Sequence, residues 1–63
     1  MAVMESRAVA EQLRDLVLPS VPDEDLDYFE AAAEDEDWAH LAQLSREAAQ
    51  AYGVDLPAEL VAA

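Results

Sequence analysis

Carboxylates are the residues of this chain with the greatest capacity for chemistry. Nine of its fifteen acidic residues fall between Asp23 and Asp37, in a chain of 63 residues. No basic residue interrupts this acidic segment (residues 23–37), and Tyr28, Phe29 and Trp38 lie within it or at its edge. Carboxylates this close together can bind a cation, take part in acid–base chemistry or attract a basic protein. Their spacing helps to decide among these uses.

A calcium site is the first use to consider. Four acidic residues match ligand positions of an EF-hand loop: Asp23, Asp25, Asp27 and Glu34. That loop needs a glycine at its sixth position for a sharp turn, and this chain has Tyr28 there. An acid-rich helix start explains the same residues, because the helix dipole favours negative charge at that end. We therefore expect no calcium site.

The sequence gives even less support for other catalytic or metal-binding sites. His40 is the only histidine, and Asp37, three residues before it, could share its helix face, but one such pair does not make a metal site. Cysteine is absent, and Ser45 lies too far along a helix from His40 to contact it. Gly53 is the only glycine, so there is no glycine-rich phosphate loop. We expect no enzyme activity, no cofactor and no bound metal.

The charge balance narrows the classes of partner. The formal net charge is -12, and the three basic residues are Arg7, Arg14 and Arg46. Nucleic-acid phosphates and anionic membrane surfaces both require clustered basic residues. We therefore expect no direct binding to nucleic acid and no membrane binding. A larger basic protein is the expected partner, because a dense negative field costs stability unless something compensates it.

The expected location is cytoplasmic. Met1 to Ala10 lacks the apolar stretch of a secretory signal, and no apolar run approaches the length needed to span a bilayer. Fourteen alanines and the absence of lysine indicate a GC-rich coding genome, so a bacterial source is expected.

The predicted fold is all-α, a single domain of residues 1–63 forming a small three- or four-helix mini-bundle. Val9, Leu13 and Val17 recur at helical spacing, and Pro19 restricts the residue before it and ends that helix. The expected helices run from about Met4 to Val17, Val21 to Glu34, Glu36 to Tyr52, and from Leu56 onward.

Capping residues set the expected helix ends. Ser20 is the expected N-cap of the second helix, and Asp35 that of the third. The apolar phase shifts between Ala33 and Trp38, which indicates a break, although one unbroken helix is the alternative because no Gly or Pro interrupts it. Gly53 should end the third helix as a left-handed cap.

The predicted core holds eleven residues: Val9, Leu13, Leu16, Val17, Leu26, Phe29, Trp38, Leu41, Leu44, Tyr52 and Leu60. So small a core is barely sufficient for a chain of this length. We expect the chain to fold alone; folding on a partner and forming a homodimer remain alternatives.

Recognition is the function that these residues favour. Aromatic anchors surrounded by charge are common at protein interfaces, and Tyr28 is the expected exposed anchor. The predicted partner-binding residues are Asp23, Glu24, Asp25, Asp27, Tyr28, Glu30, Glu34, Asp35, Glu36 and Asp37.

The leading hypothesis is an inhibitor or regulator of a basic protein. Carboxylates spaced along helices can imitate nucleic-acid phosphates, and in size and charge the chain resembles small antitoxins, immunity proteins, anti-restriction proteins and anti-CRISPR proteins. The alternative is a leader or carrier peptide, because the segment EAAQAYGVDLPAEL (Glu47 to Leu60) resembles the ends of some leader peptides of ribosomal natural products. That resemblance implies docking onto peptide-modifying enzymes. A third hypothesis is a small accessory subunit of an enzyme.

Overall fold

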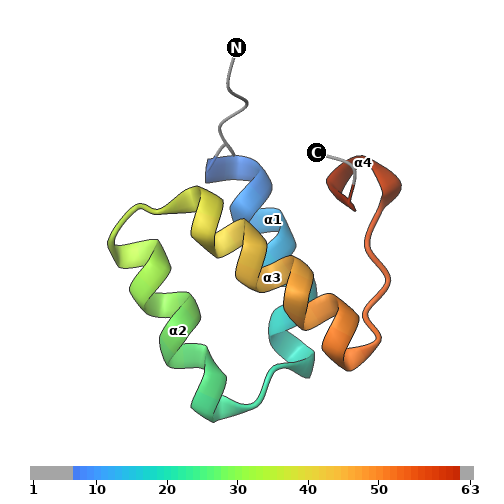
Figure 1. The fold of residues 1–63 in the computed structure, drawn as a ribbon, viewed down its shortest axis with the longest axis horizontal. Helices are drawn as coiled ribbons and strands as arrows, with labels where there is room; N and C mark the ends of the chain where they lie inside the picture. The colour runs from blue at the N-terminus through green and yellow to red at the C-terminus, as the bar shows by residue number, and fades with distance from the viewer. Residues whose placement is uncertain (1–6, 62–63) are drawn as a thin grey trace.

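The computed structural model describes residues 7–61, and the predicted all-α mini-bundle is confirmed for this part of the chain (Figure 1). Four α-helices and one short 3₁₀ helix make up the fold, and these residues contain no strand. In chain order they are α1 Arg7–Val17, η1 Leu18–Ser20, α2 Asp23–Glu34, α3 Trp38–Tyr52 and α4 Ala58–Val61. The expected first turn at residues 4–6 lies outside the described residues.

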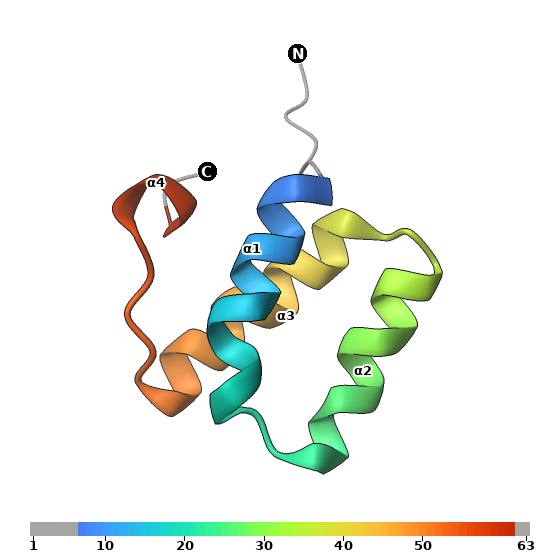
Figure 2. The same cartoon turned by 180° about the vertical axis from the view of Figure 1, so that it is seen from behind.

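The packing of α1 against α3 is the most extensive helix contact of the fold, and α2 packs against α3 to one side (Figure 1). An extended stretch after α3 then carries α4 back along the bundle to lie beside α1 (Figure 2). This order places α2, which carries most of the acidic segment, at an edge of the molecule where one face stays open to solvent.

Small residues dominate the buried surface between the helices. Alanines at positions 10, 32, 42, 48 and 49 are all buried beside the larger Leu13, Val17, Phe29 and Leu41. Because alanine is small, the helix axes can approach closely at these positions. Ser45 is also buried, and its hydroxyl donates to the carbonyl oxygen of Leu41 at 2.8 Å, which satisfies its hydrogen bond within α3.

The predicted core was right for its centre and wrong at two positions. Leu13, Val17, Phe29, Leu41 and Leu60 are buried as expected. Four other predicted members are partly buried and pack against them: Val9, Leu26, Trp38 and Leu44.

Leu16 and Tyr52 were wrongly assigned to the core, since each keeps 42% of its surface exposed. On α1 the buried stripe passes through residues 10, 13 and 17, which leaves Leu16 at its edge. Tyr52 lies in the last turn of α3, and its hydroxyl reaches Asp25 of α2.

The start of α2 differs from the expectation. Ser20 belongs to η1 and is not an N-cap, and Val21 is extended and buried. Pro22 occupies the N-cap position and makes no side-chain cap. Pro19 favours the tight turn of η1, which closes with a 3.1 Å bond from the Val21 N–H to the Leu18 carbonyl. The helix therefore begins at Asp23 instead of Val21.

The break between α2 and α3 is confirmed, and its capping residues differ from the prediction. The N–H groups of Glu36 and Asp37 donate to the carbonyls of Ala33 and Ala32 at 3.1 and 3.0 Å, which is the Schellman pattern. Glu36 takes the left-handed conformation, with φ of 56°. Asp35 therefore ends α2, and the third helix starts at Trp38 instead of Glu36.

The C-terminal end of α3 follows the prediction. Gly53 is left-handed, with φ of 69°, and the Val54 N–H donates to the Ala49 carbonyl at 2.9 Å. The last helix begins at Ala58 and not at Leu56, because Pro57 supplies its first carbonyl acceptor, for the N–H of Leu60 at 2.9 Å.

Candidate partner-binding surface

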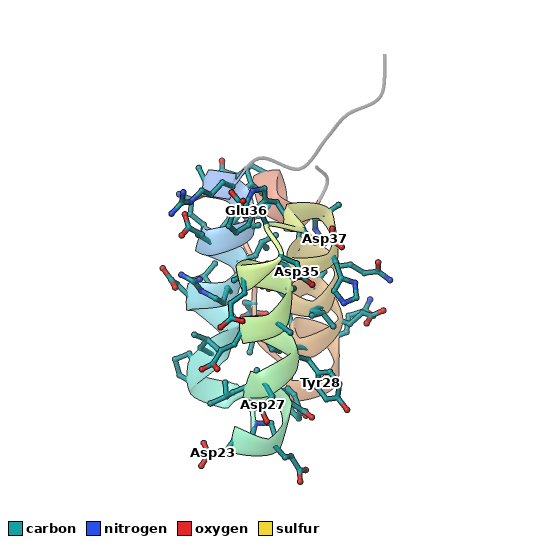
Figure 3. The ribbon with its side chains drawn as sticks, turned by 90° about the vertical axis from the view of Figure 1, so that its left-hand side faces the viewer. Asp23, Asp27, Tyr28, Asp35, Glu36 and Asp37 are labelled. Atoms are coloured by element: carbon teal, nitrogen blue, oxygen red, sulfur yellow. The ribbon has the colours of Figure 1, made fainter. Side chains whose placement is uncertain are left out.

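The outward face of α2 presents a regular stripe of carboxylates. Asp23, Asp27, Glu30 and Glu34 recur at steps of three or four residues and are all exposed. Figure 3 shows Asp23 and Asp27 along this helix, with Asp35, Glu36 and Asp37 at the turn beyond its end. Because of the helical repeat, these four carboxylates of the acidic segment lie in one line along α2.

None of the ion pairs among residues 7–61 joins one of the three arginines to this stripe. Arg7 pairs with Glu11 at 3.2 Å, and Arg14 pairs with Asp15 at 3.1 Å, all on α1. Arg46 lies on α3, and its Nε and Nη2 atoms donate to the carbonyl of Leu60 at 3.0 and 2.8 Å. Within residues 7–61 no ion pair involves a carboxylate of the acidic segment. The negative field of α2 is therefore open to an external partner.

The structure places all ten predicted partner-binding residues on α2 or the turn after it, but they are not equivalent. Asp23, Glu24, Asp27, Tyr28, Glu30 and Glu34 are exposed on α2. Asp35 and Glu36 are also exposed, in the turn that ends the helix.

Two of the ten have structural partners. Asp37 caps α3, because its Oδ1 atom accepts from the His40 N–H at 3.2 Å. Asp25 is half-buried, and its Oδ2 atom accepts from the Tyr52 hydroxyl at 3.0 Å.

The acidic residues with EF-hand spacing lie on a continuous helix. Asp23–Glu34 is α-helical throughout, so Asp25 points away from the side of α2 that Asp23 and Asp27 share, and the three carboxylates cannot wrap around one ion. Among the described residues, no group of three or more His, Asp or Glu side chains is placed to hold a metal. His40 is exposed at the start of α3.

A groove between α2 and α3 brings two exposed tyrosines together. Tyr28 is 65% exposed and Tyr52 42% exposed, and both line this groove of about 260 Å³. Asp25 and Glu47 add carboxylates to the lining. We call this feature the tyrosine groove. Sequence reasoning identified Tyr28 and Asp25 but missed Glu47 and Tyr52, whose place in the site depends on how α3 packs against α2.

Tyr52 has a perturbed acidity in this groove. Its pKa is raised above the ordinary 10.0, first because the hydroxyl donates a hydrogen bond to Asp25 and second because of partial burial. The negative charges of Asp25 and Glu24 add to the effect, since each opposes the formation of a tyrosinate. This carboxylate environment disfavours anions and favours a cation.

A second groove, of about 370 Å³, lies between the end of α1 and α2. Leu26 and Ala33 contribute apolar surface, and Glu30 and Glu34 of the acidic stripe stand at its edge beside Arg14. Its local charge is therefore mixed, unlike that of the tyrosine groove.

Among the described helices, none combines the length and the apolar character that crossing a bilayer requires. Comparison of the chain with protein-family models, with curated proteins and with solved structures found no match.

Proposed function

We propose that this chain is a non-enzymatic acidic protein that binds a basic surface of a larger protein and inhibits or regulates it. The observation that carries the proposal is the stripe of exposed carboxylates on α2, which forms no ion pair within residues 7–61. Self-repulsion within such a stripe costs folding stability, and a basic partner surface would relieve it.

The regularity of the stripe favours a surface that otherwise binds nucleic acid. One turn of an α-helix advances about 5.4 Å, so the carboxylates of α2 repeat at short, fixed intervals. A nucleic-acid strand presents its phosphates in a similar regular line. A rigid helix also loses little conformational entropy when it binds, which favours affinity. These features support an inhibitor that occupies a phosphate-binding groove.

The test is capture of the partner by the tagged chain from its native host, followed by affinity measurements across a salt series. We expect a basic nucleic-acid-binding protein that is released by high salt and displaced by duplex DNA or RNA. Salt-resistant capture of a peptide-modifying enzyme would contradict the proposal and favour a leader or carrier peptide.

A matched pair of variants locates the binding charge. The double variant Asp27→Asn/Glu30→Gln removes two charges from the α2 stripe, and Asp55→Asn/Glu59→Gln removes two exposed charges from the opposite end of the chain. We expect the first variant to weaken binding up to about thirtyfold and to flatten the salt dependence, because each of the two lost ion pairs contributes up to about 1 kcal/mol. Equal effects of the two variants would remove α2 from the interface.

A further inference from the structure

The tyrosine groove is where the surface combines exposed aromatic rings with unneutralised carboxylates. Among the described residues, the large apolar or aromatic side chains that are exposed are Leu16, Tyr28 and Tyr52, and the two tyrosines line this one groove. Figure 3 shows Tyr28 projecting from α2 on the side of α3. Its 65% exposure means that core packing does not explain its position.

The charges around the groove are all of one sign. Asp25 enters the lining from α2 and Glu47 enters it from α3, so two carboxylates come from neighbouring helices. Among the described residues, no basic side chain lines the groove. The raised pKa of Tyr52 has the same origin, because the hydroxyl lies beside Asp25 and within the field of Glu24. Charge complementarity therefore selects a cationic occupant.

The size and floor of the groove restrict that occupant further. Its volume is about 260 Å³, and Leu44 and Ala48 supply apolar surface within it. A space of this size suits one long side chain. Arginine joins an apolar stem to a planar cation that can stack on a tyrosine ring and donate two hydrogen bonds to a carboxylate.

We infer that the tyrosine groove binds one arginine side chain of the basic partner, with the guanidinium held by the Tyr28 ring and the carboxylates of Asp25 and Glu47. This inference rests on the proposed function and adds a specific anchor to the diffuse attraction of the α2 stripe. The stripe draws the partner in, and the groove fixes its register.

The test uses two capped tripeptides, acetyl-Gly-Arg-Gly-amide and the same peptide with citrulline in place of arginine. Citrulline keeps the shape of the side chain and lacks its charge. Each peptide is titrated into the full chain, and binding is followed by NMR at the rings of Tyr28 and Tyr52. We expect saturable shifts with the arginine peptide, on the order of 1 mM in Kd, and at least about tenfold weaker binding of the citrulline peptide.

Three single variants and one control separate the groove from general charge. Tyr28→Phe should keep the affinity, and Tyr28→Leu should weaken it about threefold, because only the aromatic ring provides a cation–π contact. Glu47→Gln should also weaken the affinity. Glu59→Gln, which removes an equal exposed charge outside both the groove and the α2 stripe, should leave the affinity within twofold (roughly the scatter of a screened surface charge).

Three results would overturn the inference: no saturable shift, equal binding of the two peptides, or equal losses with Glu59→Gln and Glu47→Gln. Each would still leave the proposed function standing, because capture of the partner and its dependence on the α2 stripe are measured separately. An unaltered partner affinity in Asp27→Asn/Glu30→Gln would instead count against the proposed function, whatever the tripeptides do.

Discussion

The hydroxyl of Tyr52 donates a 3.0 Å hydrogen bond to Oδ2 of Asp25, which joins two residues that are 27 positions apart in the chain. The bond connects the last turn of α3 to the first turn of α2. Because both residues line the tyrosine groove, the bond also sets the position of one ring and one carboxylate within it. A contact that helps to hold two helices together thus shapes the proposed arginine site.

The acidity of Tyr52 tests this contact directly. Replacing Asp25 with Asn removes the charge and weakens the hydrogen bond, so the Tyr52 pKa should fall toward its ordinary 10.0. Glu24→Gln should lower the Tyr52 pKa by less, because the charge of Glu24 contributes least to the raised pKa. Asp27→Asn serves as the control, since Asp27 is not among the causes. Alkaline titration of the assigned ring resonances measures the pKa in each variant. An unchanged pKa in Asp25→Asn would contradict the contact.

The same raised pKa makes stability depend on pH at the alkaline end. The folded chain holds the Tyr52 proton more tightly than the unfolded chain does. The resulting stabilisation is complete below pH 10.0 and is lost as the pH rises through the folded pKa. Urea unfolding across that range should show a falling free energy of unfolding, and Tyr52→Phe should reduce the fall. If the free energy of unfolding falls equally in Tyr52→Phe, the alkaline loss of stability comes from other titrating groups.

Glu36 and Gly53, which are both left-handed, make a reciprocal pair of predictions. Glu36 has φ of 56°, where a side chain costs energy, so Glu36→Gly should stabilise the fold by about 0.5–1 kcal/mol. Gly53 has φ of 69° and open space around it, so Gly53→Ala should destabilise by about 1 kcal/mol through backbone strain alone. Thermal and urea unfolding measure both, and a destabilised Glu36→Gly would refute the assignment of a Schellman cap there.

Local signals explain which parts of the fold could be predicted. Pro19 restricts the backbone and Gly53 adopts the left-handed conformation at little cost, and the ends of α1 and α3 follow from them. The turn at Glu36 has neither a proline nor a glycine, so the phase shift of the apolar residues was the only sign of a break. Asp37 and Asp35 are equally good N-caps in sequence. The Schellman turn with left-handed Glu36 uses Asp35 to end α2 and leaves Asp37 at the N-cap position of α3.

The candidate site was only half predictable for a similar reason. The carboxylates of α2 are visible as a charge run, and helical periodicity puts several of them on one face. Glu47 and Tyr52 belong to another helix, and no local pattern reports that α3 brings them beside Asp25. Tyr52 was wrongly assigned to the core because it continues the apolar phase of α3 past the point where burial ends.

The cap of α3 gives a further stability prediction. Asp37→Ala removes the acceptor for the His40 N–H and should cost about 1 kcal/mol, whereas Asp37→Asn should cost only a few tenths because Asn caps nearly as well. Urea unfolding with detection by circular dichroism measures both. The corresponding variant Asp35→Ala should be nearly neutral. A larger cost for Asp35→Ala than for Asp37→Ala would restore the original assignment of Asp35 as the cap.

The attachment of α4 depends on Arg46. Its side chain donates two hydrogen bonds to the carbonyl of Leu60, whose own side chain is buried. Arg46→Met keeps much of the apolar stem and removes the donors, so α4 should open more often than the rest of the fold. Amide hydrogen exchange should then accelerate several-fold at Leu60 and stay unchanged at Leu41. Equal acceleration at both amides would indicate global destabilisation instead of local release.

The difference between Leu13 and Leu16 tests which face of α1 carries the core. Leu13 is fully buried, and Leu13→Ala should destabilise the chain by about 2–5 kcal/mol, which is enough to unfold much of so small a domain. Leu16 is 42% exposed, so Leu16→Ala should cost less than about 1 kcal/mol. Thermal unfolding of both variants in parallel gives the comparison. Similar losses at the two positions would mean that the buried face of α1 extends across Leu16, as the apolar spacing alone suggested.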